Sequence, residues 1–173
     1  MKKIIYIFIF LFSLSVSGQK SLTKLLKKYN TESVPYASVK QVNNLLKISL
    51  DSAQGDNVIL LDARELKEYK VSHIKNAIHV GYDEFNLKET TSKLKDKNAT
   101  IVVYCSVGIR SEDIAEKLQK AGYTNVYNLF GGIFEWKNKE NTVVDSKNNP
   151  TEQVHTFSKA WSTWLKKGVK IYE

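Results

Sequence analysis

Residues 101–111 read IVVYCSVGIRS. Four large, mostly apolar side chains in a row are typical of a short strand buried in a parallel sheet, and this run stops at Cys105. Further along, Ile114 and Leu118 recur at helical spacing, and Gly122 suits the end of a helix. The segment therefore predicts a strand, a loop and a helix in that order, with Cys105 at the carboxyl end of the strand.

The same alternation of strands and helices continues on both sides of this segment. Apolar runs predict strands at 58–61 and 125–129, and a short one within 74–80. Apolar residues at helical spacing predict helices over 36–50, 63–69, 88–94 and 111–121. We therefore expect an α/β fold with a parallel central sheet flanked by helices. Ligands bind such sheets at the carboxyl ends of the strands, where Asp62 and Cys105 are placed.

The loop after Cys105 has the residues that would stabilise a sulfur anion. Successive backbone N–H groups in such a loop form an anion nest, and the following helix adds the positive end of its dipole. Gly108 allows a backbone conformation that a side chain would resist. Arg110 adds a fixed cation with a planar donor fork suited to an oxyanion. Together these groups are expected to lower the pKa of the cysteine and to hold an anionic group beside it.

The spacing of this loop separates two chemistries. Phosphotyrosine-type phosphatases place five residues between cysteine and arginine, whereas four separate Cys105 from Arg110, and Tyr104 stands where those enzymes have histidine. Phosphatase or arsenate reductase activity is therefore disfavoured.

Four ordered motifs carry a resemblance to the rhodanese family of sulfurtransferases. They are residues 58–65 (VILLDARE), residues 68–78 with Glu68-Tyr69 and the stretch from His73 to Ile78, the cysteine loop at 101–111, and residues 122–136, which begin Gly-Tyr and end in GGIFEW. The resemblance spans about residues 36–137. It implies a rhodanese-like fold in which Cys105 carries sulfur as a persulfide.

The resemblance also implies the reactants. The donor is a thiosulfate-like or persulfide compound, the acceptor is a thiol or a cyanide-like nucleophile, and no cofactor is needed. We expect the donor to meet the loop residues Ser106, Val107, Gly108, Ile109, Arg110 and Ser111. Ser106 stands where many active members have a basic residue, and Ser72, Lys75 and Asn76 replace Gly, Pro and Gly. The alternative is a non-catalytic rhodanese-type binding module, which would often have lost Cys105 or Arg110.

The remaining polar residues are expected to support the site. Asp62, at the end of a strand, suits a hydrogen-bond acceptor that steadies the catalytic loop. Arg64 is expected to pair with Glu68, one helical turn further on, with substrate contact as the alternative. His73 and His79 lack a neighbouring ligand, so we interpret them as structural and predict no metal.

The first 18 residues have the layout of a secretory signal peptide. Lys2 and Lys3 precede an apolar run from Ile4 to Val16, which ends in small residues at 17–18. Cleavage near Gln19 would make the protein periplasmic or secreted, and the alternative is an uncleaved anchor. The chain has one cysteine, so it forms no internal disulfide and Cys105 stays a free thiol.

The chain is basic, with a net charge of +8 that falls to +6 without the two leader lysines. The lysines are dispersed and form no dense block interleaved with aromatic residues, which disfavours nucleic acid as a partner and is compatible with a small anionic substrate.

The C-terminal segment lies outside the resemblance. Five apolar residues fall on one side of a predicted amphipathic helix over 151–166: Val154, Phe157, Trp161, Trp164 and Leu165. We expect this extra helix to pack on the domain, and the alternative is contact with a membrane surface or a partner. The expected organisation is a signal peptide (1–18), a basic segment (19–35), a rhodanese-like domain (36–137), and a linker with the C-terminal helix (138–173).

Overall fold

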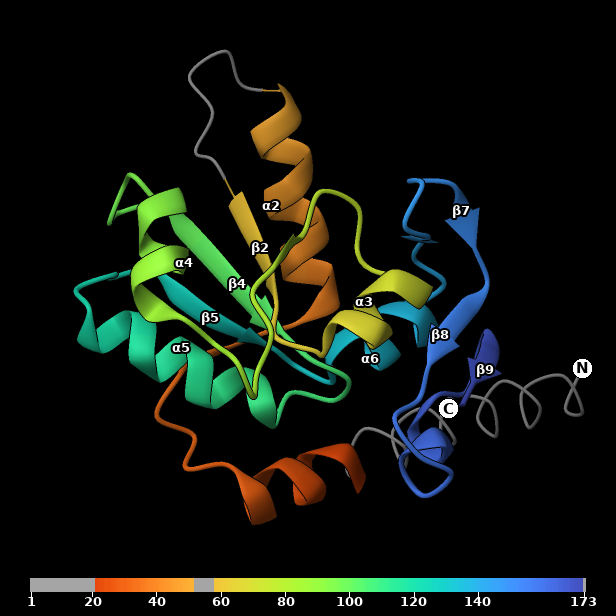
Figure 1. Ribbon diagram of the computed structural model, residues 1–173. Coiled ribbons are helices and arrows are strands. Elements are labelled where there is room, and N and C mark those ends of the chain that lie inside the picture. Colours follow the sequence, from red (N-terminus) through yellow and green to blue (C-terminus); the bar gives the residue numbers. More distant parts are fainter. Residues whose placement is uncertain (1–20, 52–57, 173) are drawn as a thin grey trace, which may run out of the picture. The chain divides into compact units, whose positions relative to one another are not determined.

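The computed structural model of the protein describes residues 21–51 and 58–172 (Figure 1). The chain divides into two compact units, residues 1–32 and 33–173. In the first unit, residues 21–29 form a helix. The predicted signal peptide at 1–18 lies outside the described residues. Among the residues that are described, every helix is too short or too polar to span a bilayer.

A five-stranded sheet forms the centre of the second unit. Its strands are β1 (Tyr36–Ala37), β2 (Val58–Asp62), β3 (Ile78–His79), β4 (Thr100–Tyr104) and β5 (Val126–Leu129). They lie in the order β1-β5-β4-β2-β3, and every pair is parallel. Because the strands are parallel, their carboxyl ends share one edge of the sheet, and Cys105 directly follows the central strand β4 at this edge.

Helices cover both faces of this sheet. They are α2 (Val39–Asp51), α3 (Leu66–Val71), α4 (Leu87–Lys93), α5 (Arg110–Lys120) and α6 (Gly132–Asn138). Figure 1 shows α4 and α5 on one side of the strands and α2 on the other. The core under α5 joins Ile101 and Val103 of β4 to Ile114 and Leu118 of the helix. The predicted α/β fold with a parallel sheet flanked by helices is confirmed.

Two helix ends follow from local chemistry. Helix α5 ends at Lys120, and Gly122, just beyond the cap residue Ala121, has a φ of +92° that turns the chain in a conformation glycine adopts readily. Helix α3 begins at Leu66 and not at Ala63, since the N–H of Ala63 still donates to the carbonyl of Tyr104 in the sheet, at 2.8 Å. Residues 63–65 therefore form the short connection between β2 and α3, and Glu65 is the N-cap of the helix.

The predicted C-terminal helix over 151–166 is wrong. The segment instead forms β6 (Val143–Val144), β7 (Pro150–Thr151), β8 (Gln153–His155), a short 3₁₀ helix at Trp161–Trp164, and β9 (Val169–Ile171). Strand β7 pairs with β6, β8 pairs with β9, and β8 lies against α3. The alternative of a membrane or partner contact rested on this amphipathic helix, so the structure gives it no support. We call residues 143–172 the C-terminal extension.

Backbone conformation explains why the helical pattern failed. Val154 is buried as part of a strand, and Phe157 has a φ of +63°, which ends any regular helix. Thr151, Thr156 and Ser158 are weak helix formers, so the spacing of the apolar residues was coincidental.

Candidate functional site

Cys105 follows β4 directly and lies at the base of the predicted loop. Its side chain is buried, and the backbone N–H of Gly108 donates to its Sγ at 3.2 Å. Gly108 has a φ of +107°, which lets the chain fold back over the sulfur, and α5 starts two residues later at Arg110. The strand, loop and helix therefore meet at the thiol as the sequence predicts.

The surroundings of Cys105 favour the thiolate. Burial alone raises the pKa of a thiol, but the positive charge of Arg110 and hydrogen bonds from Ser111 and Gly108 outweigh it. The net result is a pKa of Cys105 below its ordinary value. A buried thiol with a lowered pKa is a nucleophile, and burial also limits its contact with water.

The N-terminus of α6 is hydrogen-bonded to the backbone at the start of the cysteine loop. The N–H of Ile133 donates to the carbonyl of Cys105 at 2.9 Å, and that of Phe134 donates to the carbonyl of Ser106 at 3.1 Å. A Cβ on Gly132 would lie 2.3 Å from the Cys105 carbonyl oxygen, and the φ of Gly132 is +55°. Only glycine allows α6 to approach the loop this closely, so Gly132 belongs to the site.

Asn128, buried near the end of β5, is bonded to two residues of the cysteine loop. Its Nδ2 donates to the carbonyl of Gly108 at 2.8 Å, and its Oδ1 accepts a hydrogen bond from Ser111 Oγ, also at 2.8 Å. Each amide atom thus fixes a residue beside the thiol. Sequence reasoning missed Asn128, although a polar residue between apolar positions of a predicted buried strand was a usable signal.

Arg110 is held by a bidentate ion pair. Its two terminal nitrogens donate to the carboxylate of Glu68 at 2.8 and 2.9 Å, and one of them also donates to Ser106 Oγ at 3.1 Å. Glu68 is fully buried, and its Oε1 accepts a further hydrogen bond from Ser106 Oγ. Burial raises the pKa of a carboxyl, but the contacts with Arg110 outweigh it and keep the pKa of Glu68 below its ordinary value. The fork that we expected to hold the donor is thus engaged within the protein.

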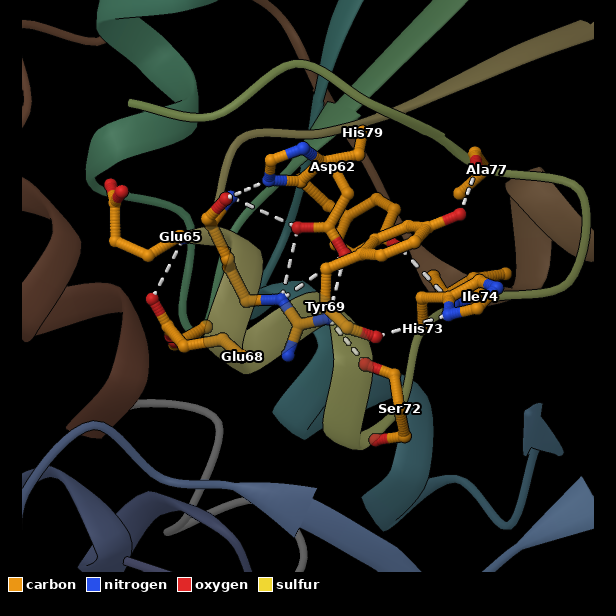
Figure 2. Close-up of polar contacts among 12 residues, drawn as sticks. Asp62, Glu65, Glu68, Tyr69, Ser72, His73, Ile74, Ala77 and His79 are labelled. Atoms are coloured by element: carbon orange, nitrogen blue, oxygen red, sulfur yellow. Dashed lines mark hydrogen bonds and ion pairs between the residues drawn. The ribbon is translucent and has the colours of Figure 1, made fainter. Parts of the chain in front are cut away.

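Asp62 and Arg64 form a second buried pair on the neighbouring strand end. The Asp62 carboxylate, drawn in Figure 2, accepts from the backbone N–H of Arg64 at 3.0 Å and from its guanidinium at 2.6 Å. The guanidinium also donates to the carbonyl of Ser72 at 2.6 Å. The predicted pairing of Arg64 with Glu68 is therefore wrong, because Glu68 turns toward Arg110. Asp62 is a hydrogen-bond acceptor, as expected, but its carboxylate holds Arg64, and through it the chain at Ser72, rather than the cysteine loop.

A cavity of about 180 Å³ opens beside the thiol. One side is formed by the loop, through Cys105–Val107, Ile109 and Arg110, and the other by Phe157 and Trp161 of the C-terminal extension. Of the loop positions expected to meet the donor, Gly108 and Ser111 lie outside the lining and act on the sulfur through hydrogen bonds. The two aromatic residues were not predicted here, because the sequence placed them on a separate helix.

The family model for the Rhodanese-like domain matches residues 47–139, which is more than half of the chain. This protein belongs to the rhodanese-like family. The fold and the strand–Cys–loop–helix unit described above are what the family assignment from the sequence implied.

Two relatives show what this chain is similar to. The chain is 35% identical over 92 residues to the thiosulfate sulfurtransferase GlpE of Coxiella burnetii. The matched segment covers 53% of this chain and 83% of the relative. It is 36% identical over 104 residues to a tRNA uridine(34) hydroxylase of Buchnera aphidicola, covering 58% of this chain and 31% of that protein. The chain thus spans most of the first relative and about a third of the second.

A solved thiosulfate sulfurtransferase from Pseudomonas aeruginosa shares the rhodanese-like fold. The superposition has a TM-score of 0.58 at 21% identity and covers 86% of this chain and 26% of that one. At this identity the likeness concerns the fold alone.

The two histidines of this rhodanese-like domain are engaged separately. A ring nitrogen of His73 lies 3.1 Å from the carbonyl of Tyr69, on whose ring it stacks, and His79 Nε2 lies 2.8 Å from the carbonyl of Arg64 (Figure 2). Within the described ranges, no three His, Cys, Asp or Glu side chains gather as a metal site would require. Both histidines therefore have structural partners, as we expected.

Proposed function

We propose that this protein is a sulfurtransferase that carries sulfane sulfur on Cys105. The observation that carries the proposal is the buried thiol with a lowered pKa, held by the Gly108 N–H and faced by Arg110. Membership of the rhodanese-like family and the likeness to a protein named thiosulfate sulfurtransferase support it.

The first step is a displacement at sulfur. The Cys105 thiolate attacks the outer sulfur of thiosulfate or of a persulfide, the sulfur–sulfur bond of the donor breaks, and sulfite or a thiolate leaves with the electron pair. Cys105 then bears a persulfide whose negative charge replaces that of the thiolate. The Gly108 N–H already donates to Sγ, and the positive charge of Arg110 beside the pocket stabilises the charge on the outer sulfur of the persulfide.

The second step regenerates the thiolate. A cyanide ion or a thiolate attacks the outer sulfur of the persulfide, and the Cys105 sulfur leaves with the electron pair. The products are thiocyanate or a new persulfide. Sulfur is transferred between nucleophiles in both steps, so neither step needs an external oxidant or reductant. The catalytic part in this proposal is the domain at 36–137, with residues 138–172 as an addition to it.

Thiocyanate formation tests this function. Purified protein with thiosulfate and cyanide should form thiocyanate, and so should protein given glutathione persulfide as the donor. The Cys105→Ser variant keeps the volume of the side chain and should be inactive with both. If the wild type and Cys105→Ser form thiocyanate at equal rates, or if neither exceeds the uncatalysed reaction, the domain is a binding module and the proposal is wrong.

We also propose that the protein is exported. The support is the sequence of residues 1–18, with two lysines before an apolar run and small residues after it. N-terminal sequencing of the native protein should find a start near Gln19 in the periplasmic or secreted fraction. A start at Met1 in the cytoplasmic fraction would contradict export.

A further inference from the structure

Phe157 and Trp161 form an aromatic wall over the thiol pocket. Both line the cavity opposite the Cys105 loop, and both come from the C-terminal extension. Aromatic side chains offer a broad apolar surface at low entropic cost, which suits the binding of an apolar group. The wall therefore narrows the range of compounds that the thiol can meet.

The backbone at Phe157 is strained in a way that holds its ring at the site. Its φ is +63°, a region that bulky residues rarely occupy, and its side chain remains 46% exposed. The N–H of Phe157 donates to the Nδ1 of buried His155 at 3.1 Å, and the ring centroid lies 5.4 Å from the Arg110 guanidinium carbon. Strain of this kind persists where surrounding contacts enforce it and gathers at ligand sites. A half-exposed ring contributes little to the hydrophobic core, so its fixed position at the pocket is better explained by contact with a ligand.

The charges that line the pocket do not favour a small, doubly charged donor. Arg110 is the one charged side chain among the described residues that line the cavity, and its fork is bound to buried Glu68. The pair is close to neutral, and Ser106 stands beside it with no charge of its own. A doubly charged donor such as thiosulfate gains little here to offset the loss of its hydration.

We propose that the preferred sulfur donor is an organic sulfane-sulfur compound whose carried group is apolar and flat, and that Phe157 and Trp161 select it. This inference rests on the sulfurtransferase function proposed above and names the substrate class of the same site. The cavity of about 180 Å³ is large enough, since an apolar protein cavity of about 150 Å³ holds benzene. The apolar group lies against the two rings, and its sulfane sulfur faces Cys105.

The reaction with an aromatic thiosulfonate balances in the same way as with thiosulfate. The Cys105 thiolate attacks the outer sulfur, a sulfur–sulfur bond forms at Cys105, and the sulfur–sulfur bond of the donor breaks. The aromatic sulfinate leaves with the electron pair. The thiolate and the thiosulfonate carry one negative charge each, and so do the two products, the persulfide and the sulfinate.

The test compares three donors with cyanide as the common acceptor: thiosulfate, methanethiosulfonate and benzenethiosulfonate. Each value of kcat/KM is divided by the rate constant of the same donor with free glutathione, which removes its intrinsic reactivity. We expect the corrected preference for benzenethiosulfonate over methanethiosulfonate to be roughly tenfold or more, the size expected from burying a few apolar groups.

Three variants locate this preference. Phe157→Gly removes the ring and suits the positive φ, so it keeps the fold. Trp161→Ala removes the second ring. Trp164→Ala is the matched control, because Trp164 lies in the same 3₁₀ helix and does not line the cavity. Thermal unfolding of each variant shows whether the extension is still folded.

The outcomes separate the two proposals. A preference that falls to near one in Phe157→Gly and Trp161→Ala, and persists in Trp164→Ala, supports the aromatic wall. Thiocyanate formation without a preference for the aromatic donor, or with a preference that both pocket variants retain, overturns the wall and leaves the sulfurtransferase intact. Failure of all three donors, and of glutathione persulfide as well, to give thiocyanate overturns the sulfurtransferase, and the wall with it.

Discussion

Arg110 and Glu68 are joined by two parallel hydrogen bonds of 2.8 and 2.9 Å, although 42 positions separate them in the sequence. Glu68 lies in α3, and Arg110 is the first residue of α5. The pair therefore ties the helix after β2 to the helix after the cysteine loop. It fixes the cation whose charge lowers the pKa of Cys105.

The first prediction concerns the stability that this pair provides. Glu68→Gln leaves Arg110 largely buried without its counter-charge, and breaking such a pair costs about 3–5 kcal/mol when both groups are buried. We expect a loss near 3 kcal/mol in urea unfolding at pH 7, because the Arg110 side chain is 18% exposed. Glu89→Gln, at the exposed pair with Lys93, is the control and should change little.

The pH dependence of the same pair has a definite sign. The pKa of Glu68 in the folded protein lies below its value in the unfolded chain, which is about 4.3. The advantage of the wild type over Glu68→Gln is therefore complete at neutral pH and is lost as the pH falls from about 4.3 through the folded pKa. A difference in stability that stays constant down to pH 2 would contradict this account.

The second prediction concerns the thiol itself. Arg110→Ala removes the cation whose charge favours the thiolate, so the pKa of Cys105 should rise. The pH profile of alkylation by iodoacetamide should shift upward in Arg110→Ala and recover only in part in Arg110→Lys, which lacks the bidentate fork. Lys120→Ala, an exposed residue at the other end of α5, should leave the profile unchanged. A wild-type midpoint at or above about 8.5, the value of a free thiol, would mean that the loop does not favour the thiolate.

The third prediction concerns the close approach of α6 to the loop. Gly132→Ala places a Cβ against the carbonyl of Cys105 and strains the backbone at φ +55°. Gly81→Ala meets similar strain at φ +69°, but its Cβ has its nearest neighbour at an ordinary 3.8 Å. We expect Gly81→Ala to cost roughly 1–2 kcal/mol and Gly132→Ala at least about 3 kcal/mol, together with most of the sulfur-transfer activity. If both variants lose the same stability in thermal unfolding, the cysteine loop can shift away from the added Cβ at little cost, which would contradict this account.

Local patterns in the sequence predicted the parts of the site that are local. The apolar run before Cys105, Gly108 and the helix after Arg110 are contiguous, and each element has its own periodicity or turn residue. The fold class followed from the same alternation. Nothing local indicates which of two acidic residues an arginine will reach. Arg64 was therefore assigned to Glu68, whereas it binds Asp62, two positions away.

The aromatic residues of the C-terminal extension show the limit of periodicity. Phe157 and Trp161 are spaced as on a helix, and that spacing predicted one. Their true place depends on β8 pairing with β9 and on the left-handed backbone at Phe157, which are tertiary effects. The contribution of this extension to the pocket was therefore visible only in three dimensions.

The sulfurtransferase account is tested most directly by the mass of the intact protein after exposure to a sulfane-sulfur donor. After thiosulfate, glutathione persulfide or benzenethiosulfonate, the wild type should gain the mass of one sulfur atom. The gain should disappear on treatment with cyanide and should be absent in Cys105→Ala. No added sulfur on Cys105 with any of these donors, or an equal gain in Cys105→Ala, would contradict the account.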